Sequence, residues 1–192
     1  MINKIGIFGG TFDPVHIGHL ITTQFVLEKR SLDKIIFIPC NISPLKRDNL
    51  NSSPDHRLSM LKLAIDSSTQ FDISNFELEK GNVSYTYDTL CEMKKKYREI
   101  ELIIGYDNLV AFDKWYKPDE IFKLADVIVM KRSCDEDKVV NHKYFDKAII
   151  LDTPGIEISS TEIRNRVKNN LPIDYLVPQK VKEYIFSNGL YK

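Results

Sequence analysis

Short apolar runs alternate with helical patterns along most of this 192-residue chain, and no other feature of the sequence restricts the fold as strongly. Each run is nearly continuous and rich in β-branched residues, which is typical of strands covered on both faces. The runs span residues 5–8, 34–38, 102–104, 127–130 and 148–151. Helical patterns separate them, near 16–30, 55–67, 86–97 and 118–125. This order predicts an α/β fold: a doubly wound parallel sheet with right-handed crossovers and helices on both faces.

The end of the chain departs from this alternation. Residues 159–169 and 178–187 are two helical patterns with no strand between them. The length of the chain favours one domain. We therefore expect a single domain, 1–192, in which a core of residues 1–157 is followed by a small helical C-terminal part, 158–192.

The first C-terminal helix has a recognisable start and a predicted buried side. Ser159 and Glu162 have the spacing of a capping box, in which Ser159 caps the helix and Glu162 reaches back. The side that packs on the core is predicted to consist of Ile163, Val167 and Leu171, which recur every four residues.

Charge and cysteine content exclude several classes of protein. Lysine plus arginine and aspartate plus glutamate both number 27, so the formal net charge is zero, whereas a nucleic-acid-binding protein usually has a basic excess. No apolar run approaches the roughly 18 residues of a membrane span, and the N-terminus lacks the layout of a signal peptide. The three cysteines form no CxxC pair, which argues against a disulfide framework and a zinc ribbon. We expect a cytoplasmic protein with reduced thiols, no membrane segment and no nucleic-acid partner.

The segment GGTFDPVHIGH at 9–19 follows the first predicted strand and has the features of a phosphate site. Gly9 and Gly10 allow the backbone to approach a ligand closely. His16 and His19 are three residues apart, so both imidazoles project from one face of the first helical turn. That turn also presents free N–H groups and the positive end of the helix dipole. The imidazoles can donate hydrogen bonds to phosphate oxygens, and with an ordinary pKa near 6.5 we expect them to do so as cations.

Other interpretations of this segment are weaker. A single histidine at a helix start is usually a surface residue, but a pair of histidines behind two glycines is less ordinary. A metal site would need third and fourth ligands that the neighbourhood does not supply. The segment also lacks the GxGxxG spacing of a dinucleotide site and the GKS or GKT ending of a P-loop.

A second segment, ISSTEIR at 158–164, is distant in the sequence but has related chemistry. Its three hydroxyls, Ser159, Ser160 and Thr161, lie at a predicted helix N-terminus, and Arg164 adds a planar set of donors. Alone, this segment is most simply a capped surface helix. Together, two helix ends suited to anions predict a ligand with a long phosphate chain, and ATP is the obvious candidate.

These two segments also carry a resemblance to a known family. GGTFDPVHIGHL is similar to the (H/T)xGH signature of the nucleotidyltransferase superfamily, and ISSTEIR resembles the second ATP-phosphate motif of its adenylyltransferase branch. Nearly the whole chain resembles the bacterial nicotinate-nucleotide adenylyltransferases. The supporting pieces are SYTYDTL at 84–90, GYDN at 105–108, Phe112, Trp115 and the C-terminal ending from Tyr175 to Tyr191.

The resemblance implies a Rossmann-like fold and a set of residues that bind ATP and Mg²⁺. The residues that would line the ATP site are Gly9, Gly10, Thr11, Phe12, Gly105 and Asp107, the last two beside the ribose and adenine. The residues that would hold the β/γ end are Ser159, Ser160, Thr161 and Arg164. The residues that would neutralise phosphate charge during catalysis are His16, His19, Lys46 and Arg164. Mg²⁺ would bridge ATP oxygens and keep most of its waters, with no metal ligand from the protein.

For the mononucleotide, the resemblance implies that Trp115 stacks on the pyridine ring and that Thr86 lies near the nicotinate carboxylate. A lone tryptophan is more often a core residue, and Thr86 could equally be an ordinary helix cap. Two positions depart from the family pattern. Leu45 replaces the histidine of a Pro-His-Lys segment, and Tyr106 stands where a small residue is usual, so that it could reshape the pocket beside Asp107.

The reaction implied is transfer of the adenylyl group of ATP to nicotinate mononucleotide, with release of pyrophosphate. Nicotinamide mononucleotide and phosphopantetheine remain alternative acceptors, and a nucleotide sensor without turnover remains an alternative class. A tRNA-charging fragment is disfavoured by the zero net charge and by the lack of a KMSKS-like loop. The sequence leaves the oligomeric state open, because Tyr144 and Phe145 suit either a homo-oligomer contact or the core.

Overall fold

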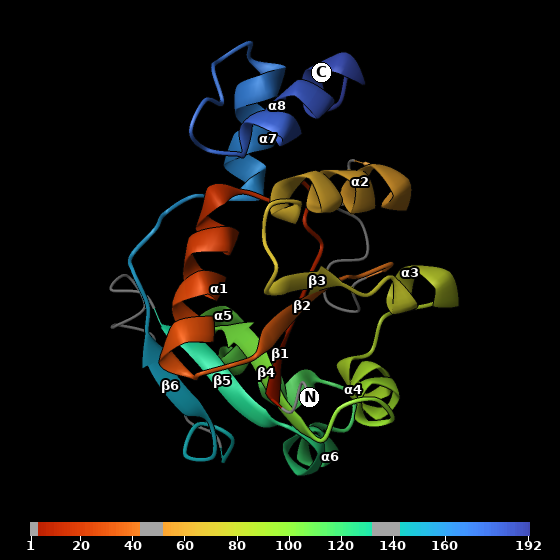
Figure 1. The fold of residues 1–192 in the computed structure, drawn as a ribbon, viewed down its shortest axis with the longest axis vertical. Coiled ribbons are helices and arrows are strands. Elements are labelled where there is room, and N and C mark those ends of the chain that lie inside the picture. The colour runs from red at the N-terminus through yellow and green to blue at the C-terminus, as the bar shows by residue number, and fades with distance from the viewer. Residues whose placement is uncertain (1–3, 43–51, 132–142) are drawn as a thin grey trace.

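The computed structural model describes residues 4–42, 52–131 and 143–192. Within these residues six strands form one parallel sheet in the order β3-β2-β1-β4-β5-β6 (Figure 1). The strands are β1 (Lys4–Gly10), β2 (Lys34–Pro39), β3 (Phe71–Ile73), β4 (Glu99–Gly105), β5 (Asp126–Lys131) and β6 (Ile149–Asp152). The predicted doubly wound parallel sheet is confirmed.

Helices cover both faces of this sheet, as predicted. In chain order they are α1 (Ile17–Lys29), α2 (Pro54–Ile65), α3 (Phe76–Lys80), α4 (Thr86–Lys94), α5 (Tyr106–Val110), the 3₁₀ turn η1 (Phe112–Lys114), α6 (Pro118–Leu124), α7 (Ser160–Lys168) and α8 (Gln179–Ser187). The periodicity analysis missed β3, α3 and α5. Each of these has five residues or fewer, which is too short for a periodic pattern to stand out.

Strand β2 shows why the strand runs are continuously apolar. Ile35 and Phe37 pack into the cluster beneath α1, α2, α7 and α8, whereas Ile36 and Ile38 pack into the cluster beneath α4, α5 and α6. Successive side chains of a strand point to opposite faces, and here both faces are buried. A continuous run is therefore what this sheet requires.

The strand order reverses between β1 and β4, which are neighbours in the sheet but not in sequence. The chain winds outward from β1 to β3, then returns to β4 and winds outward to β6 on the other side. In open α/β sheets, ligands bind beside the carboxyl ends of the strands at such a reversal. Gly10 and Gly105 end these two strands, so the fold places both of them at this crevice.

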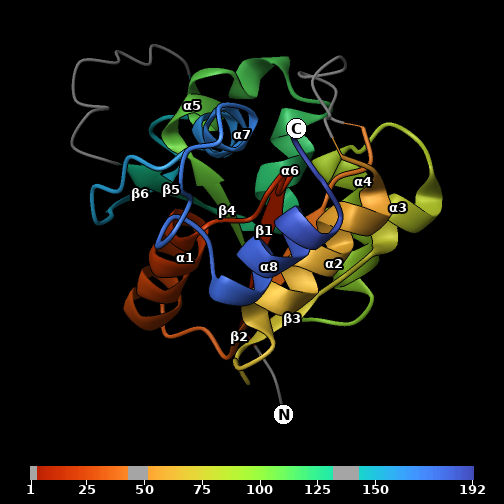
Figure 2. The same ribbon diagram turned by 90° about the horizontal axis from the view of Figure 1, so that it is seen from above.

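The C-terminal helices lie at the carboxyl-end side of the sheet (Figures 1 and 2). Ile163 and Val167 of α7 are buried in the same cluster as α1 and α2, as predicted. Leu171 is 48% exposed, so its assignment to the buried side is wrong, because α7 ends at Lys168 and the helical repeat ends with it. Ser159 does cap α7, its Oγ accepting from the N–H of Glu162 at 3.1 Å. Within the described residues the Glu162 side chain makes no return contact, so only half of the predicted capping box forms.

The apolar pair Tyr144 and Phe145 packs in the core and does not form an exposed surface patch. Tyr144 is 5% exposed and stacks on Phe122 with ring centroids 5.6 Å apart, and Phe145 packs against the same cluster, so this apolar pair belongs to the core. No helix within the described residues is both long enough and apolar enough to cross a membrane.

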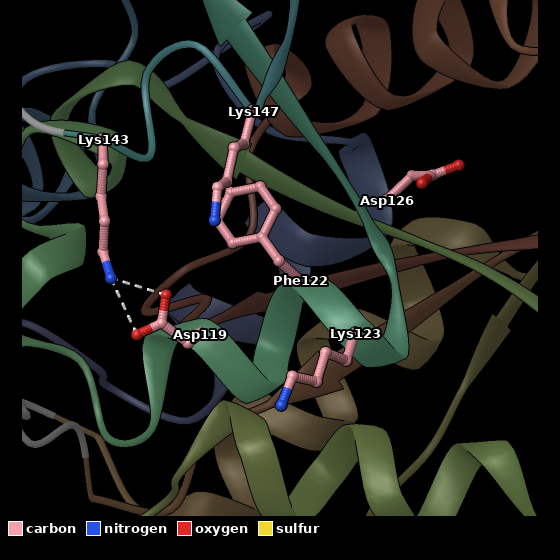
Figure 3. Close-up of a pocket in the computed structure, with 6 residues that line it drawn as sticks. All are labelled: Asp119, Phe122, Lys123, Asp126, Lys143 and Lys147. Atoms are coloured by element: carbon pink, nitrogen blue, oxygen red, sulfur yellow. Dashed lines mark hydrogen bonds and ion pairs between the residues drawn. The ribbon is translucent and has the colours of Figure 1, made fainter.

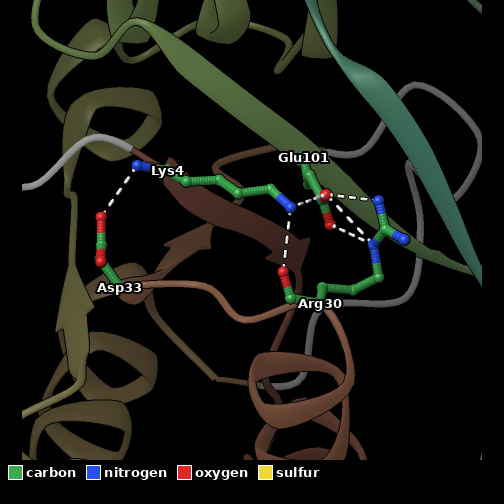
Figure 4. A network of polar contacts seen from close by, with 4 residues as sticks. All are labelled: Lys4, Arg30, Asp33 and Glu101. Atoms are coloured by element: carbon green, nitrogen blue, oxygen red, sulfur yellow. Dashed lines mark hydrogen bonds and ion pairs between the residues drawn. The ribbon is translucent and has the colours of Figure 1, made fainter.

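A buried carboxylate joins the amino ends of β1 and β4 to the end of α1 (Figure 4). The Glu101 side chain is 2% exposed and accepts from the Arg30 guanidinium at 2.7 and 2.9 Å and from Lys4 Nζ at 2.8 Å. Lys4 Nζ also donates to the carbonyl of Arg30 at 2.9 Å. Both cations keep about a quarter of their side-chain surface in solvent, so they remain hydrated if the carboxylate is removed.

Glu101→Gln is therefore expected to lower the free energy of unfolding by about 2 kcal/mol, the usual value for hydrogen bonds to a charged group. In a chain of this size that corresponds to a melting temperature lower by about 4–8 °C. Activity at 25 °C should not change, because the network lies at the amino ends of the strands, away from the crevice. Thermal unfolding by circular dichroism measures this, with Glu99→Gln on the exposed start of β4 as the control. Equal melting temperatures for Glu101→Gln and the unsubstituted protein would contradict it.

Candidate active site

The tips of α1 and α7 converge at the carboxyl-end side of the sheet (Figure 1). Arg164 Nη1 donates to the carbonyl of Asp13 at 2.8 Å, and Ser160 Oγ donates to the carbonyl of Pro14 at 2.8 Å. These contacts join residues about 150 positions apart in sequence, 151 in one case and 146 in the other. The predicted convergence of the two helix tips is confirmed by this geometry. Binding of ATP by the tips stays a prediction.

The two histidines cap α1 jointly. His16 is the N-cap residue, and its Nδ1 accepts from the N–H of His19, while Nδ1 of His19 accepts from the N–H of His16, each at 3.3 Å. Their rings stack with centroids 3.6 Å apart, which confirms that both project from one face. A Cβ at Gly18 would lie 3.1 Å from His16 Nδ1, so a glycine there leaves room for this arrangement. An Nδ1 that accepts carries no proton, so each neutral ring holds its proton on Nε2 and can donate it to a ligand.

The expectation that these histidines act as cations is wrong for the free protein. Burial lowers the pKa of His16 to about 4. Burial, together with the neighbouring His16, lowers the pKa of His19 well below its ordinary value. Both rings are therefore neutral donors near pH 7. Among the described residues predicted to hold phosphate, Arg164 supplies the permanent positive charge, and it is half-buried.

This neutrality makes stability depend on pH. In the unfolded chain His16 takes up a proton as the pH falls through 6.5, but in the folded protein only near pH 4. The unfolded state thus binds more protons between these values, so the stabilisation is complete above pH 6.5 and is lost as the pH falls toward 4. For one such group the free energy of unfolding falls by up to about 1.4 kcal/mol per pH unit.

The test is His16→Asn, which keeps an N-cap acceptor but does not titrate. The free energy of unfolding of this variant, measured by urea titration, should fall less between pH 7 and 5. Parallel curves for both proteins would refute this.

Phe12 does not line the crevice with its side chain, so its predicted place in the ATP site would depend on its backbone. The ring is 1% exposed and packs edge-on against Phe8 and His19, with centroids 5.6 and 5.3 Å away. The backbone of Phe12 has φ +51°, a left-handed conformation that turns this side chain down into the core. Phe12 therefore supports the His19 ring from below, and only its backbone can face a ligand. A Cβ at Gly10 would lie 3.0 Å from this ring, so a side chain there would press against it.

Arg57 of α2 contacts the loop that holds the predicted ATP residues, and the sequence analysis did not single it out. It is fully buried, and its Nη1 donates to the carbonyl of Thr11 at 2.9 Å and to that of Cys40 at 2.7 Å. Its Nε and Nη2 atoms are buried without a hydrogen-bond partner in the described part of the chain. The arginine thus joins the loop after β1 to the end of β2. Its helical spacing from the buried Met60 and Leu61 was the available signal, because it places Arg57 on the core-facing side of α2.

The predicted ribose and adenine residues lie where β4 ends. Gly105 is the N-cap residue of α5, and Asp107 is exposed in the first turn of that helix. Tyr106 is 5% exposed and packs into the core cluster on the α5 side of the sheet. The core therefore accommodates the bulk of Tyr106, and an effect of Tyr106 on the pocket beside Asp107 stays a prediction.

The predicted mononucleotide residues lie on two segments that pack together. Tyr116, next to Trp115, lies against Tyr85 and Tyr87 on either side of Thr86, with ring centroids 4.9 and 5.9 Å away. Thr86 begins α4, but the N-cap residue is Tyr85 and no side-chain cap bond forms, so the alternative that Thr86 is a cap is wrong.

Trp115 is half-buried, so it is partly a core residue and keeps some surface exposed. It stacks on Phe112 with centroids 4.8 Å apart, so one ring face packs against a core residue. Its Nε1 is buried without a partner among the residues described. Whether the ring also contacts a pyridine stays a prediction.

The structure does not test two of the predicted residues, and it offers no group of metal ligands within the residues that it describes. Lys46 and the departure at Leu45 fall in residues 43–51, which lie outside the described residues. Within the described ranges no group of three or more His, Cys, Asp or Glu residues is placed to hold a metal ion.

A surface cavity of about 640 Å³ lies away from the crevice (Figure 3). It is lined by residues of α6, the start of β5 and the turn before β6, namely Asp119, Phe122, Lys123, Asp126, Lys143 and Lys147. Lys143 forms an ion pair with Asp119 at 2.8 Å. Because Asp126 begins β5, this cavity opens at the amino ends of the strands, where ligands of such sheets do not bind.

The doubly wound sheet, with two anion-suited helix tips beside its strand reversal, is the arrangement of an α/β nucleotidyltransferase. The family model described as cytidylyltransferase-like matches residues 7–166, which agrees with this class. The chain is 44% identical over 193 residues to the nicotinate-nucleotide adenylyltransferase of Bacillus subtilis (strain 168), with both chains covered in full. It is 40% identical over 204 residues to a probable nicotinate-nucleotide adenylyltransferase of Clostridium beijerinckii, again with full coverage. The chain belongs to the nicotinate-nucleotide adenylyltransferase family.

A solved structure shares the fold. The nicotinic acid mononucleotide adenylyltransferase of Plasmodium falciparum, complexed with NaAD, superposes with a TM-score of 0.75. It is 22% identical, and the match covers 98% of this chain and 97% of that one. The likeness supports the sheet order and the helix placement described above.

Proposed function

We propose that this enzyme transfers the adenylyl group of ATP to nicotinate mononucleotide, giving nicotinate adenine dinucleotide and pyrophosphate, a step of NAD biosynthesis. The observation that carries the proposal is the pair of contacts from α7 to the carbonyls of Asp13 and Pro14, which bring the tips of α1 and α7 together. Membership in the family supports the choice of nicotinate mononucleotide as the acceptor, because the relatives are named nicotinate-nucleotide adenylyltransferases.

The triphosphate would lie between the two helix tips. The Nε2–H groups of His16 and His19 would donate to its oxygens from the α1 side. Arg164, with the hydroxyls of Ser159 and Thr161, would hold the β/γ end from the α7 side, and Lys46 would add a second cation. Ser160 would contribute its backbone N–H at the helix start, because its hydroxyl donates to the carbonyl of Pro14. The C-terminal part, 158–192, thereby completes the ATP site, and the whole chain functions as one domain.

The chemistry needs no protein nucleophile. An oxygen of the mononucleotide phosphate attacks the α-phosphorus of ATP in line, and the bond from that phosphorus to the oxygen bridging to the β-phosphate breaks. The attacking phosphate is already an anion near neutral pH, so a general base is not required. The protein contributes orientation and donors for the charge that grows on the pyrophosphate.

Mg²⁺ would arrive with ATP. The side chains at the helix tips are imidazoles, hydroxyls and a guanidinium, which suit phosphate oxygens rather than a hard cation. The bound ion would be held by phosphate oxygens and water, and it would supply further neutralisation of the phosphates. We place the reaction in the cytoplasm, because the free thiols Cys40 and Cys91 suit a reducing compartment.

The experiment is a comparison of acceptors. The protein is incubated with ATP, Mg²⁺ and, separately, nicotinate mononucleotide, nicotinamide mononucleotide or phosphopantetheine, and released pyrophosphate and the adenylylated product are measured. We expect fastest turnover with nicotinate mononucleotide. Faster turnover with another acceptor would overturn the assigned substrate, and tight ATP binding without pyrophosphate from any acceptor would favour a nucleotide sensor.

A further inference from the structure

The carboxylate of Asp13 joins parts of the chain that are far apart in sequence. It is 2% exposed, and its Oδ1 accepts hydrogen bonds from the hydroxyls of Ser52 and Tyr191, the latter at 2.7 Å. Asp13 lies between β1 and α1, Ser52 precedes α2, and Tyr191 follows α8. The same residue's backbone carbonyl accepts from Arg164 of α7. Asp13 thus joins the loop between β1 and α1 to the start of α2, to α7 and to the end of the chain.

The contact between Tyr191 and Asp13 forms although the backbone of Tyr191 has an unfavourable conformation. Tyr191 has φ +64°, a left-handed conformation that is unfavourable for a bulky side chain. Such a conformation persists where the surrounding structure determines it, and here the ring packs against the core cluster that contains α8 while the hydroxyl reaches Asp13. Burial and the Asp13 carboxylate raise the pKa of Tyr191, so its hydroxyl remains a donor at physiological pH.

Asp13 lies in the loop that leads into α1, so its contact with Tyr191 affects the orientation of that loop as well as the C-terminus. Pro14, the next residue, has the carbonyl that accepts from Ser160, and His16, the N-cap residue of α1, follows two residues later. The orientation of the loop from Asp13 to His16 therefore sets how the imidazoles of α1 lie relative to the guanidinium of α7. A small displacement of such donors from a reacting group costs much more in rate than in stability.

We propose that Tyr191 is a positioning residue for adenylyl transfer, whose hydroxyl fixes the Asp13 carboxylate and so aligns His16, His19 and Arg164 on the triphosphate. This inference rests on the proposed function. Tyr191 touches no reacting atom and acts through the loop.

The test is Tyr191→Phe, which removes the hydroxyl and keeps the ring. We expect kcat to fall about 10-fold, within the range that misplaced groups produce. The KM for nicotinate mononucleotide should stay within about twofold, because Thr86 and Trp115 are on other segments. The ATP-induced rise in melting temperature should also shrink, and this readout does not depend on the acceptor. Ser52→Ala removes the other hydroxyl donor and should act in the same direction, with the double variant losing less than the product of the two effects.

Tyr175→Phe is the matched control, since Tyr175 lies in the same C-terminal part and is 92% exposed. Tyr175→Phe should leave kcat, KM and the ATP-induced rise in melting temperature unchanged. A folded Tyr191→Phe protein with unchanged kcat would overturn the inference, as would an equal loss in Tyr175→Phe. If Tyr191→Phe fails to fold, Ser52→Ala decides by the same criteria. Turnover of the unsubstituted protein with nicotinate mononucleotide is measured first, so failure of the proposed function is seen separately.

Discussion

Replacing His19 with alanine is expected to lower kcat by about 10²–10³-fold, the usual cost of losing one preorganised donor to a developing oxyanion. The ring that would be removed is held in place on two sides. Its Nδ1 accepts from the N–H of His16 at 3.3 Å, and the ring packs in a T-shaped arrangement with the Phe12 ring, with centroids 5.3 Å apart. These contacts orient Nε2–H before any ligand binds, so the protein does not have to reorganise to use it.

The same contacts predict a modest effect of His19→Ala on stability. The substitution removes one half of the shared cap of α1, which is worth about 1 kcal/mol. We therefore expect a folded protein with a slightly lower unfolding midpoint in urea and a large loss of turnover. His56→Ala is the control, because His56 lies on α2 and its ring nitrogen pairs with the hydroxyl of Tyr184 at 2.9 Å. A kcat near that of the unsubstituted protein at saturating substrates would remove His19 from the mechanism.

Arg164→Ala should lower kcat/KM for ATP to a similar extent, about 10²–10³-fold, because its guanidinium is the permanent positive charge at the α7 tip. It also holds the loop through its bonds to the carbonyl of Asp13 at 2.8 Å and to Thr161 Oγ1 at 3.2 Å. Arg164→Lys keeps a charge but cannot make both bonds while facing a phosphate, since an ammonium lacks the planar fork. We expect the lysine variant to recover only part of the loss.

A nearby arginine on the same helix serves as the control for this prediction. Arg166 donates through Nε to the carbonyl of Pro172 at 2.9 Å, which lies in the turn after α7. Arg166→Ala should leave kcat/KM unchanged. Initial rates of pyrophosphate release over a range of ATP concentrations measure both variants. If Arg164→Ala and Arg166→Ala were equally active, the α7 tip would have no part in binding the triphosphate.

The neutral histidines at the start of α1 illustrate where pattern reasoning was insufficient. The spacing of His16 and His19 correctly predicted that both rings share a face, because helix geometry is local. It could not predict their charge, because their pKa values depend mainly on how deeply the folded chain buries the two rings. The same reason explains Phe12, whose place in the motif suggested a ligand contact but whose ring fills the core beneath His19.

The sequence by itself determined the order and type of the longer elements, the parallel sheet, the two helix tips and the resemblance to a family of adenylyltransferases. These follow from apolar periodicity, caps and short motifs, which are properties of neighbouring residues. Only the tertiary structure decided that Arg57 is buried against Thr11 and Cys40, and that Tyr191 reaches back to Asp13. Such contacts arise when distant segments pack, and the free energy that selects them depends on which surfaces meet rather than on any local pattern.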